Sequence, residues 1–86
     1  MEKIYRIQKQ ITLNIIEVLK EKNVNENEYV EYLHQRTSLN KKRIKNLLDI
    51  NVKKRMTLKE IEIIALGLSI DIAILFKGVL QSGTKN

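Results

Sequence analysis

The sequence NKKRIKNLL, residues 40–48, carries the pattern that decides the fold of this chain. Asn40 is a favourable N-cap, because its side chain can accept a hydrogen bond from the first turn of a helix. The apolar residues fall on one side of that helix: Leu39, Ile44, Leu47 and Leu48. The other positions are basic or polar: Lys41, Lys42, Arg43, Lys45 and Asn46. The stretch therefore predicts a short basic helix that packs on a core through one side.

Positive charge is concentrated around this predicted helix. Residues 36–55 carry eight basic side chains and one acidic side chain, Asp49, for a net charge of +7, whereas the other 66 residues net to −1. A local positive patch attracts a polyanion such as nucleic acid. An arbitrary charge run is most often a solvated surface, but here the basic residues flank a capped helix and most acidic residues lie elsewhere. This segregation favours a nucleic-acid-binding surface.

Composition limits the class of protein. Eighty-six residues, 43% of them hydrophobic and 30% charged, are typical of one small globular domain. The chain has no cysteine and a single histidine, His34, which excludes a disulfide framework and a zinc cluster of soft ligands. No apolar run approaches the roughly 18 residues of a membrane-spanning helix. We see no catalytic or phosphate-binding motif, and therefore expect a cytoplasmic protein that is not an enzyme and has no cofactor, no metal, and no membrane or small-molecule partner.

Two further helices are predicted before the basic helix. Proline is absent, and all three glycines lie at or beyond Gly67, so helix breakers are missing from this region. Apolar residues at helical spacing over residues 11–19 predict a first helix that ends near Asn23, and residues 1–10 form an N-terminal extension that can prolong it. Asn25 and Glu28 have the spacing of a capping box for a second helix over residues 26–35.

A loop and two helices are predicted after the basic helix. Residues 51–56 lack an apolar period, whereas Thr57 and Glu60 form a Thr-x-x-Glu capping box for a fourth helix. Ser69 or Asp71 can cap a short fifth helix, and residues 77–86 are expected to form a flexible tail. The predicted buried side of the fourth helix is Leu58, Ile61, Ile64, Ala65 and Leu68. The later apolar residues suit either a subunit interface or the core: Ile70, Ile72, Ile74, Val79 and Leu80.

This order of elements resembles the lambda-repressor and Cro-like helix-turn-helix family, also called the xenobiotic-response-element family. The resemblance covers about residues 11–76 and rests on family spacing at these positions: Ala65, Leu68, Ile70, Ile72, Leu75 and Phe76. It implies an all-α, compact five-helix domain. It also implies that residues 41–48 enter the major groove of double-stranded DNA and that two copies, a homodimer, bind a two-fold site.

The sequence departs from the family at three places. Glu26 stands where a glutamine is usual, and a phosphate would repel its carboxylate. The connection around residues 34–38 is longer than the usual tight turn and contains no glycine. The glycine that usually follows the third helix is also missing, so we expect Asn51 to adopt the left-handed conformation there.

The candidate site residues fall into two groups, because base contacts specify a DNA sequence and phosphate contacts position the protein. The candidate base-contacting residues are Lys41, Lys42, Arg43, Lys45 and Asn46. Among them Arg43 suits guanine and Asn46 suits adenine. The candidate phosphate-contacting residues are Arg36, Asn40, Lys53, Lys54 and Arg55.

We expect a transcriptional regulator, a repressor of the kind carried by small phages and mobile elements, that occupies an operator. The alternative is a protein-interaction module or inhibitor that binds an acidic protein partner.

Overall fold

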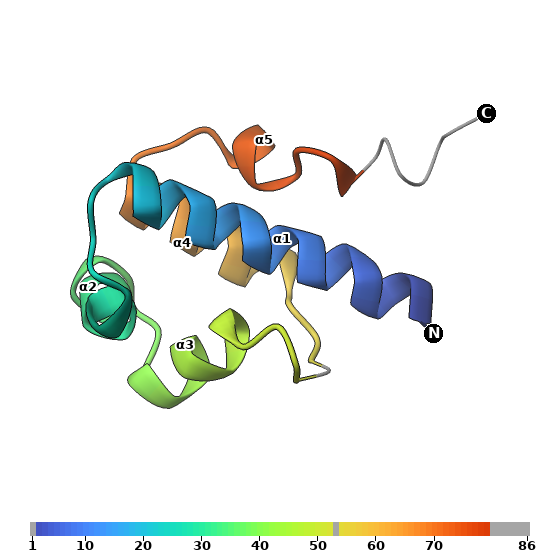
Figure 1. The fold of residues 1–86 in the computed structure, drawn as a ribbon, viewed down its shortest axis with the longest axis horizontal. Coiled ribbons are helices and arrows are strands. Elements are labelled where there is room, and N and C mark those ends of the chain that lie inside the picture. The colour runs from blue at the N-terminus through green and yellow to red at the C-terminus, as the bar shows by residue number, and fades with distance from the viewer. Residues whose placement is uncertain (1, 53, 80–86) are drawn as a thin grey trace.

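The computed structural model describes residues 2–52 and 54–79 and is all-α over that part of the chain, as the sequence predicts (Figure 1). Its elements are α1 (Glu2–Glu21), the 3-10 helix η1 (Glu26–Glu28), α2 (Tyr29–Arg36), α3 (Lys41–Leu48), α4 (Leu58–Leu68) and α5 (Ile72–Leu75). Among the described residues, no helix has the length and apolar character needed to cross a membrane.

Helix α1 runs along the length of the molecule, with α5 on one side of it and α2 and α3 on the other (Figure 1). The helix begins at Glu2, so the described part of the predicted N-terminal extension belongs to it. It ends where Asn23 adopts a positive φ of 62° and the Val24 N–H donates to the Leu19 carbonyl at 3.1 Å. Because these features form a Schellman-type end, the predicted stop near Asn23 is confirmed.

The core lies where α1, α2, α3, α4 and α5 meet. Its largest fully buried apolar side chains are Ile15, Leu19, Leu33, Ile44, Leu47, Ile64, Leu68 and Leu75. The predicted buried side of α4 is confirmed except at Leu58, which is 59% exposed. Leu58 is the first residue of α4 and lines a surface groove with Ile7 and Met56, so it lies at the edge of the core rather than inside it.

The caps predicted for the later helices are present. The Asn40 side chain accepts a hydrogen bond from the Arg43 N–H at 2.7 Å, and Thr57 and Glu60 form both hydrogen bonds of the capping box. Of the two candidate caps for α5, Asp71 is the one used, since it accepts from the Ala73 N–H at 2.9 Å. Ser69 instead ends α4 in the left-handed conformation, with φ 58°.

The predicted cap at Asn25 is wrong. Asn25 makes no side-chain cap hydrogen bond, residues Glu26–Glu28 form η1, and α2 begins at Tyr29. The Glu28 N–H, which a capping box would pair with the Asn25 side chain, instead donates to the Asn25 backbone carbonyl at 2.8 Å. This bond closes a 3-10 turn and leaves no donor for the predicted box.

The C-terminal boundary also lies later than predicted. Val79 is buried in the core, and the Asn14 side chain donates to the carbonyls of Leu75 and Lys77 at 2.9 and 2.8 Å. The packed domain therefore continues past residue 76 to Val79, because α1 holds the chain after α5. The rest of the predicted tail, including Leu80, lies outside the described residues.

Candidate nucleic-acid interface

Helix α3 presents one side to the core and the opposite side to solvent. Ile44 and Leu47 are buried, and the buried Thr12 hydroxyl of α1 donates to the Leu47 carbonyl at 2.8 Å. Four side chains of the helix are exposed: Lys41, Lys42, Lys45 and Asn46. Because α3 is fixed to α1 from behind, these four side chains are available to a partner outside the protein.

The connection between α2 and α3 spans only residues 37–40, which is shorter than the sequence predicts, because α2 continues to Arg36. It contains no glycine. The Thr37 hydroxyl donates to the Leu33 carbonyl at 2.7 Å and accepts from the Leu39 N–H at 3.3 Å, which turns the chain locally. Gly67 of α4 packs against this turn, where a Cβ atom would lie 2.8 Å from the Arg36 carbonyl oxygen. The glycine that permits the close approach therefore lies on α4 and not in the turn.

Lys41 pairs with α2. Its Nζ lies 2.6 Å from Glu31 Oε1, and the Gln35 side chain donates to Glu31 Oε2 at 3.0 Å. The hydrogen bond from Lys41 is the main cause that lowers the pKa of Glu31. Both partners of the ion pair are about half exposed, so the pair contributes little to stability, and Lys41 can exchange the carboxylate for a phosphate at small cost.

Arg43 does not face solvent with the other basic side chains. Its Nε donates to Glu60 Oε2 at 2.7 Å, and its Nη2 donates to Glu60 Oε1 at 2.9 Å and to the Arg55 carbonyl at 2.5 Å. The pKa of Glu60 is lowered mainly by the hydrogen bond from Arg43, against the opposing effect of burial. The expected contact of Arg43 with guanine does not fit this geometry, because the guanidinium points toward α4.

Lys54 is buried, with 7% exposure, and does not face solvent either. Its Nζ donates to the Asp49 carbonyl at 2.5 Å and to the Val52 carbonyl at 3.4 Å. Burial lowers the pKa of Lys54, although the Asp49 charge partly opposes this effect. The expected phosphate contact of Lys54 does not fit, because its ammonium satisfies carbonyls that follow α3.

The end of α3 explains why the prediction for Asn51 is wrong. Asp49 is the C-cap in an extended conformation, with φ −88° and ψ 109°. Among the described residues other than glycine, positive φ occurs at Asn23 and Ser69 and not at Asn51. Where α3 ends, the Asp49 carbonyl accepts hydrogen bonds from the Lys54 ammonium and from the Val52 N–H, without a left-handed conformation at Asn51.

The remaining candidate residues lie around α3. Arg36 is exposed at the end of α2, with its guanidinium 3.9 Å from the centre of the Tyr32 ring. Asn40 is exposed but its side-chain oxygen is engaged as the N-cap of α3. Arg55 is exposed in the loop before α4, and Lys53 lies outside the described residues.

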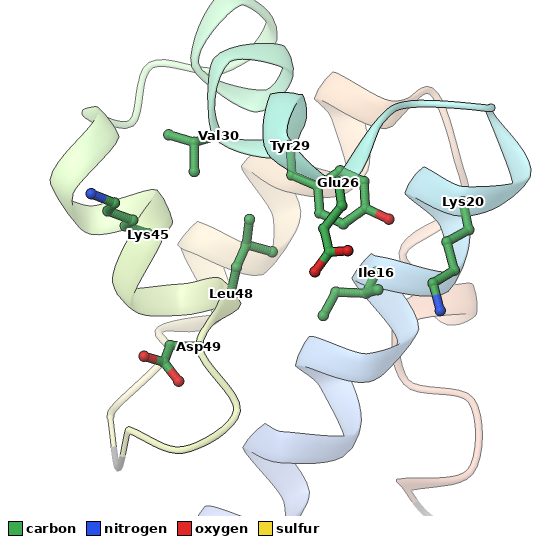
Figure 2. Close-up of a pocket in the computed structure, with 8 residues that line it drawn as sticks. All are labelled: Ile16, Lys20, Glu26, Tyr29, Val30, Lys45, Leu48 and Asp49. Atoms are coloured by element: carbon green, nitrogen blue, oxygen red, sulfur yellow. The ribbon is translucent and has the colours of Figure 1, made fainter.

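A groove of about 320 Å³ lies behind α3, between that helix, α1 and the start of α2 (Figure 2). Figure 2 shows the Glu26 carboxylate beside Leu48 and just above Ile16, whereas the side chains of Lys45 and Asp49 point away from the groove. The charged groups of the groove therefore do not converge on one ligand position. Glu26 faces this groove and not the lysine-bearing outer side of α3, so it does not interrupt that surface.

Sequence reasoning missed two residues that shape this surface. Glu60 has the spacing of a capping residue, which gives no sign that it also binds Arg43, 17 positions away. Gly67 is an ordinary helix position in the sequence, and its contact with the α2–α3 turn depends on packing.

The described residues contain no group of histidine and acidic side chains that could hold a metal ion. Comparison of the chain with protein-family models, with curated proteins and with solved structures gives no match.

Proposed function

We propose that this chain binds double-stranded DNA through helix α3 and represses transcription by occupying an operator. The observation that carries the proposal is the outer side of α3, where Lys42, Lys45 and Asn46 are exposed. Within the described part of the chain, none of these three side chains makes a hydrogen bond or an ion pair. A capped, rigidly packed helix with free basic and amide groups suits the major groove, which admits an α-helix.

The chemistry of the three side chains supports reading of base edges. The Asn46 amide can pair with adenine through two hydrogen bonds, and the ammonium groups of Lys42 and Lys45 can donate to guanine oxygen and nitrogen atoms. Arg36, Lys41 and Arg55 supply positive charge around the helix and suit phosphate contacts.

One short helix reads few base pairs, so we propose that two copies of the chain bind one operator. In this arrangement the two α3 helices lie about 34 Å apart, one turn of DNA, on a site with two-fold symmetry. Footprinting tests the arrangement. A protected site with two half-sites supports it, and a single asymmetric half-site contradicts it.

Titration of labelled duplex DNA at increasing salt tests the function itself. We expect the logarithm of affinity to fall linearly with the logarithm of salt concentration, with a slope of about −0.9 for each phosphate contact. The matched control is Lys77→Ala, because Lys77 is exposed and comes two residues after α5 in the sequence. Helix α5 lies on the side of α1 away from α3 (Figure 1), so this substitution should leave the slope unchanged. Absence of binding at low salt would reject the proposal and favour a protein-interaction module.

Selection from a randomised operator library tests the role of Asn46. Asn46→Ala should cost about 1 to 3 kcal/mol at a single base position and leave nonspecific affinity nearly unchanged. A uniform loss across all sequences would show that α3 positions the protein and does not read bases.

A further inference from the structure

We propose that Arg43 is a positioning residue of the DNA-binding surface: by joining Glu60 to the Arg55 carbonyl, it fixes α3 and the following loop on the N-terminus of α4. The inference rests on the proposed function of α3, and it assigns to Arg43 a role other than contact with a base.

The guanidinium of Arg43 bridges two segments at once. Its Nε and Nη2 atoms bind the two carboxylate oxygens of Glu60 at 2.7 and 2.9 Å, and Nη2 also binds the Arg55 carbonyl. Such a two-pronged contact fixes orientation as well as distance, because the guanidinium is planar. A lysine at this position keeps the charge but cannot reproduce the fork.

The Glu60 carboxylate serves α4 as well as α3. Its Oε1 atom accepts from the Thr57 N–H at 3.0 Å, and its own backbone N–H donates to the Thr57 hydroxyl at 3.1 Å. The chain between Arg55 and Thr57 is thereby held at both ends, by Arg43 at the Arg55 carbonyl and by Glu60 at the Thr57 N–H. The exposed Arg55 side chain therefore projects from a fixed backbone.

A two-pronged contact of Arg43 with guanine through Nε and Nη2 would require three hydrogen bonds to break, two to Glu60 and one to the Arg55 carbonyl. The Glu60 side chain is only 17% exposed. If Arg43 moved away, the negative charge of the Glu60 carboxylate would stay largely buried beside the capping box, without its cationic partner. An unpaired buried charge is strongly unfavourable. The exposed lysines on the outer side of α3 carry no such cost, which separates their role from that of Arg43.

Glu60→Gln separates the two possible roles of Arg43. Glutamine is compatible with the capping box and can keep the contact with Thr57, but it removes the charge that holds Arg43. If Arg43 is a positioning residue, Glu60→Gln and Arg43→Gln should each weaken operator binding by on the order of 10-fold, and the double variant should be no weaker than either single variant. Arg43→Lys should weaken operator binding as Arg43→Gln does, although it keeps the net charge, because lysine cannot form the two-pronged contact with Glu60.

The opposite result overturns the inference. If Arg43 reads a base, Glu60→Gln should preserve or strengthen operator binding, because it frees Arg43 and removes one negative charge. Arg43→Gln should then lose discrimination at one guanine in either background, and the effects of the two substitutions should add.

A measurement without DNA separates this inference from the proposed function. Arg43 binds the carbonyl of the peptide bond that trypsin cuts after Arg55, so Arg43→Gln and Glu60→Gln should each speed that cleavage by on the order of 10-fold. Cleavage after Lys9, inside α1, reports global unfolding and should change little. Unchanged cleavage after Arg55 in both variants overturns the positioning role, whether or not the protein binds DNA. Faster cleavage in a protein that does not bind DNA supports the bridge and rejects only the proposed function.

Discussion

Helix α3 and the loop that follows it are both basic, but they direct their basic side chains differently. In α3, Lys42 and Lys45 point to solvent, as the helical period requires for positions away from the buried Ile44 and Leu47. In the loop, Lys54 is buried and its ammonium binds backbone carbonyls. The helical period therefore predicts the outward direction of these two lysines, whereas the irregular loop has no period that could predict the direction of Lys54. Arg43 is the exception within α3, because its guanidinium reaches Glu60 of α4.

The difference also changes how the net charge of residues 36–55 should be understood. Arg43 and Lys54 direct their charges to a carboxylate and to carbonyl groups within the protein. The positive charge that faces an outside partner is therefore smaller than the charge counted along the sequence. The comparison predicts that helix lysines control DNA affinity and that Lys54 does not.

The largest effect is expected from reversing charge on the helix. Combined Lys42→Glu and Lys45→Glu substitutions should lower affinity for duplex DNA by on the order of 100-fold, because like charges then face the phosphates. The matched control reverses Lys22 and Lys77, which are exposed and lie outside residues 36–55. Binding assays at one salt concentration compare the two variants. Equal losses would mean that only total charge matters.

Gly67→Ala should disturb the α2–α3 turn, which precedes α3, although Gly67 itself lies on α4. A Cβ atom at Gly67 would lie 2.8 Å from both the Arg36 carbonyl oxygen and the Thr37 methyl carbon. We expect a loss of about 1 to 3 kcal/mol in the free energy of unfolding, measured with urea, because the α2–α3 turn must shift. Alanine normally stabilises a helix relative to glycine by about 1 kcal/mol, so a stabilised variant would contradict this close packing.

Acid should weaken the contact between Arg43 of α3 and Glu60 of α4. The pKa of Glu60 is held below its usual value of 4.5, chiefly by the hydrogen bond from Arg43. A carboxylate with a lowered folded-state pKa contributes stability that is complete above its unfolded pKa and is lost as pH falls through the folded value. The free energy of unfolding should therefore decrease as the pH is lowered below about 4.5. The decrease should be less steep in Glu60→Gln than in the wild-type protein.

Urea titrations at high salt isolate this effect. Salt screens the exposed Glu31–Lys41 pair, whose carboxylate also has a lowered pKa, more than the largely buried Glu60. The same acid dependence in wild type and in Glu60→Gln would show that other carboxylates dominate.

The smallest effects are expected from single changes in the loop. Arg55→Ala should reduce the magnitude of the salt slope by about 0.9, the value for one phosphate contact. Lys54→Met should leave the slope unchanged, because its ammonium binds protein carbonyls and not DNA. A slope change in Lys54→Met equal to that in Arg55→Ala would show that Lys54 leaves its buried position when DNA binds.

Local chemistry explains which parts of the fold could be predicted. The bounds of α3 over Lys41–Leu48 and the capping box at Thr57 agree with prediction, since caps and helical periodicity act over a few neighbouring residues. The same reasoning failed at Asn25, where the backbone carbonyl replaced the side chain as the acceptor. Sequence alone cannot choose between two acceptors on one residue.

The sequence by itself determined the helices, most of their buried sides and the concentration of positive charge, because each depends on neighbouring residue types. Only the tertiary structure decided which of those charges face outward. The Arg43–Glu60 pair joins α3 to α4, and the Gly67 contact joins α4 to the α2–α3 turn. Both depend on distances between residues far apart in the chain, and such distances are fixed only when the helices pack on a common core.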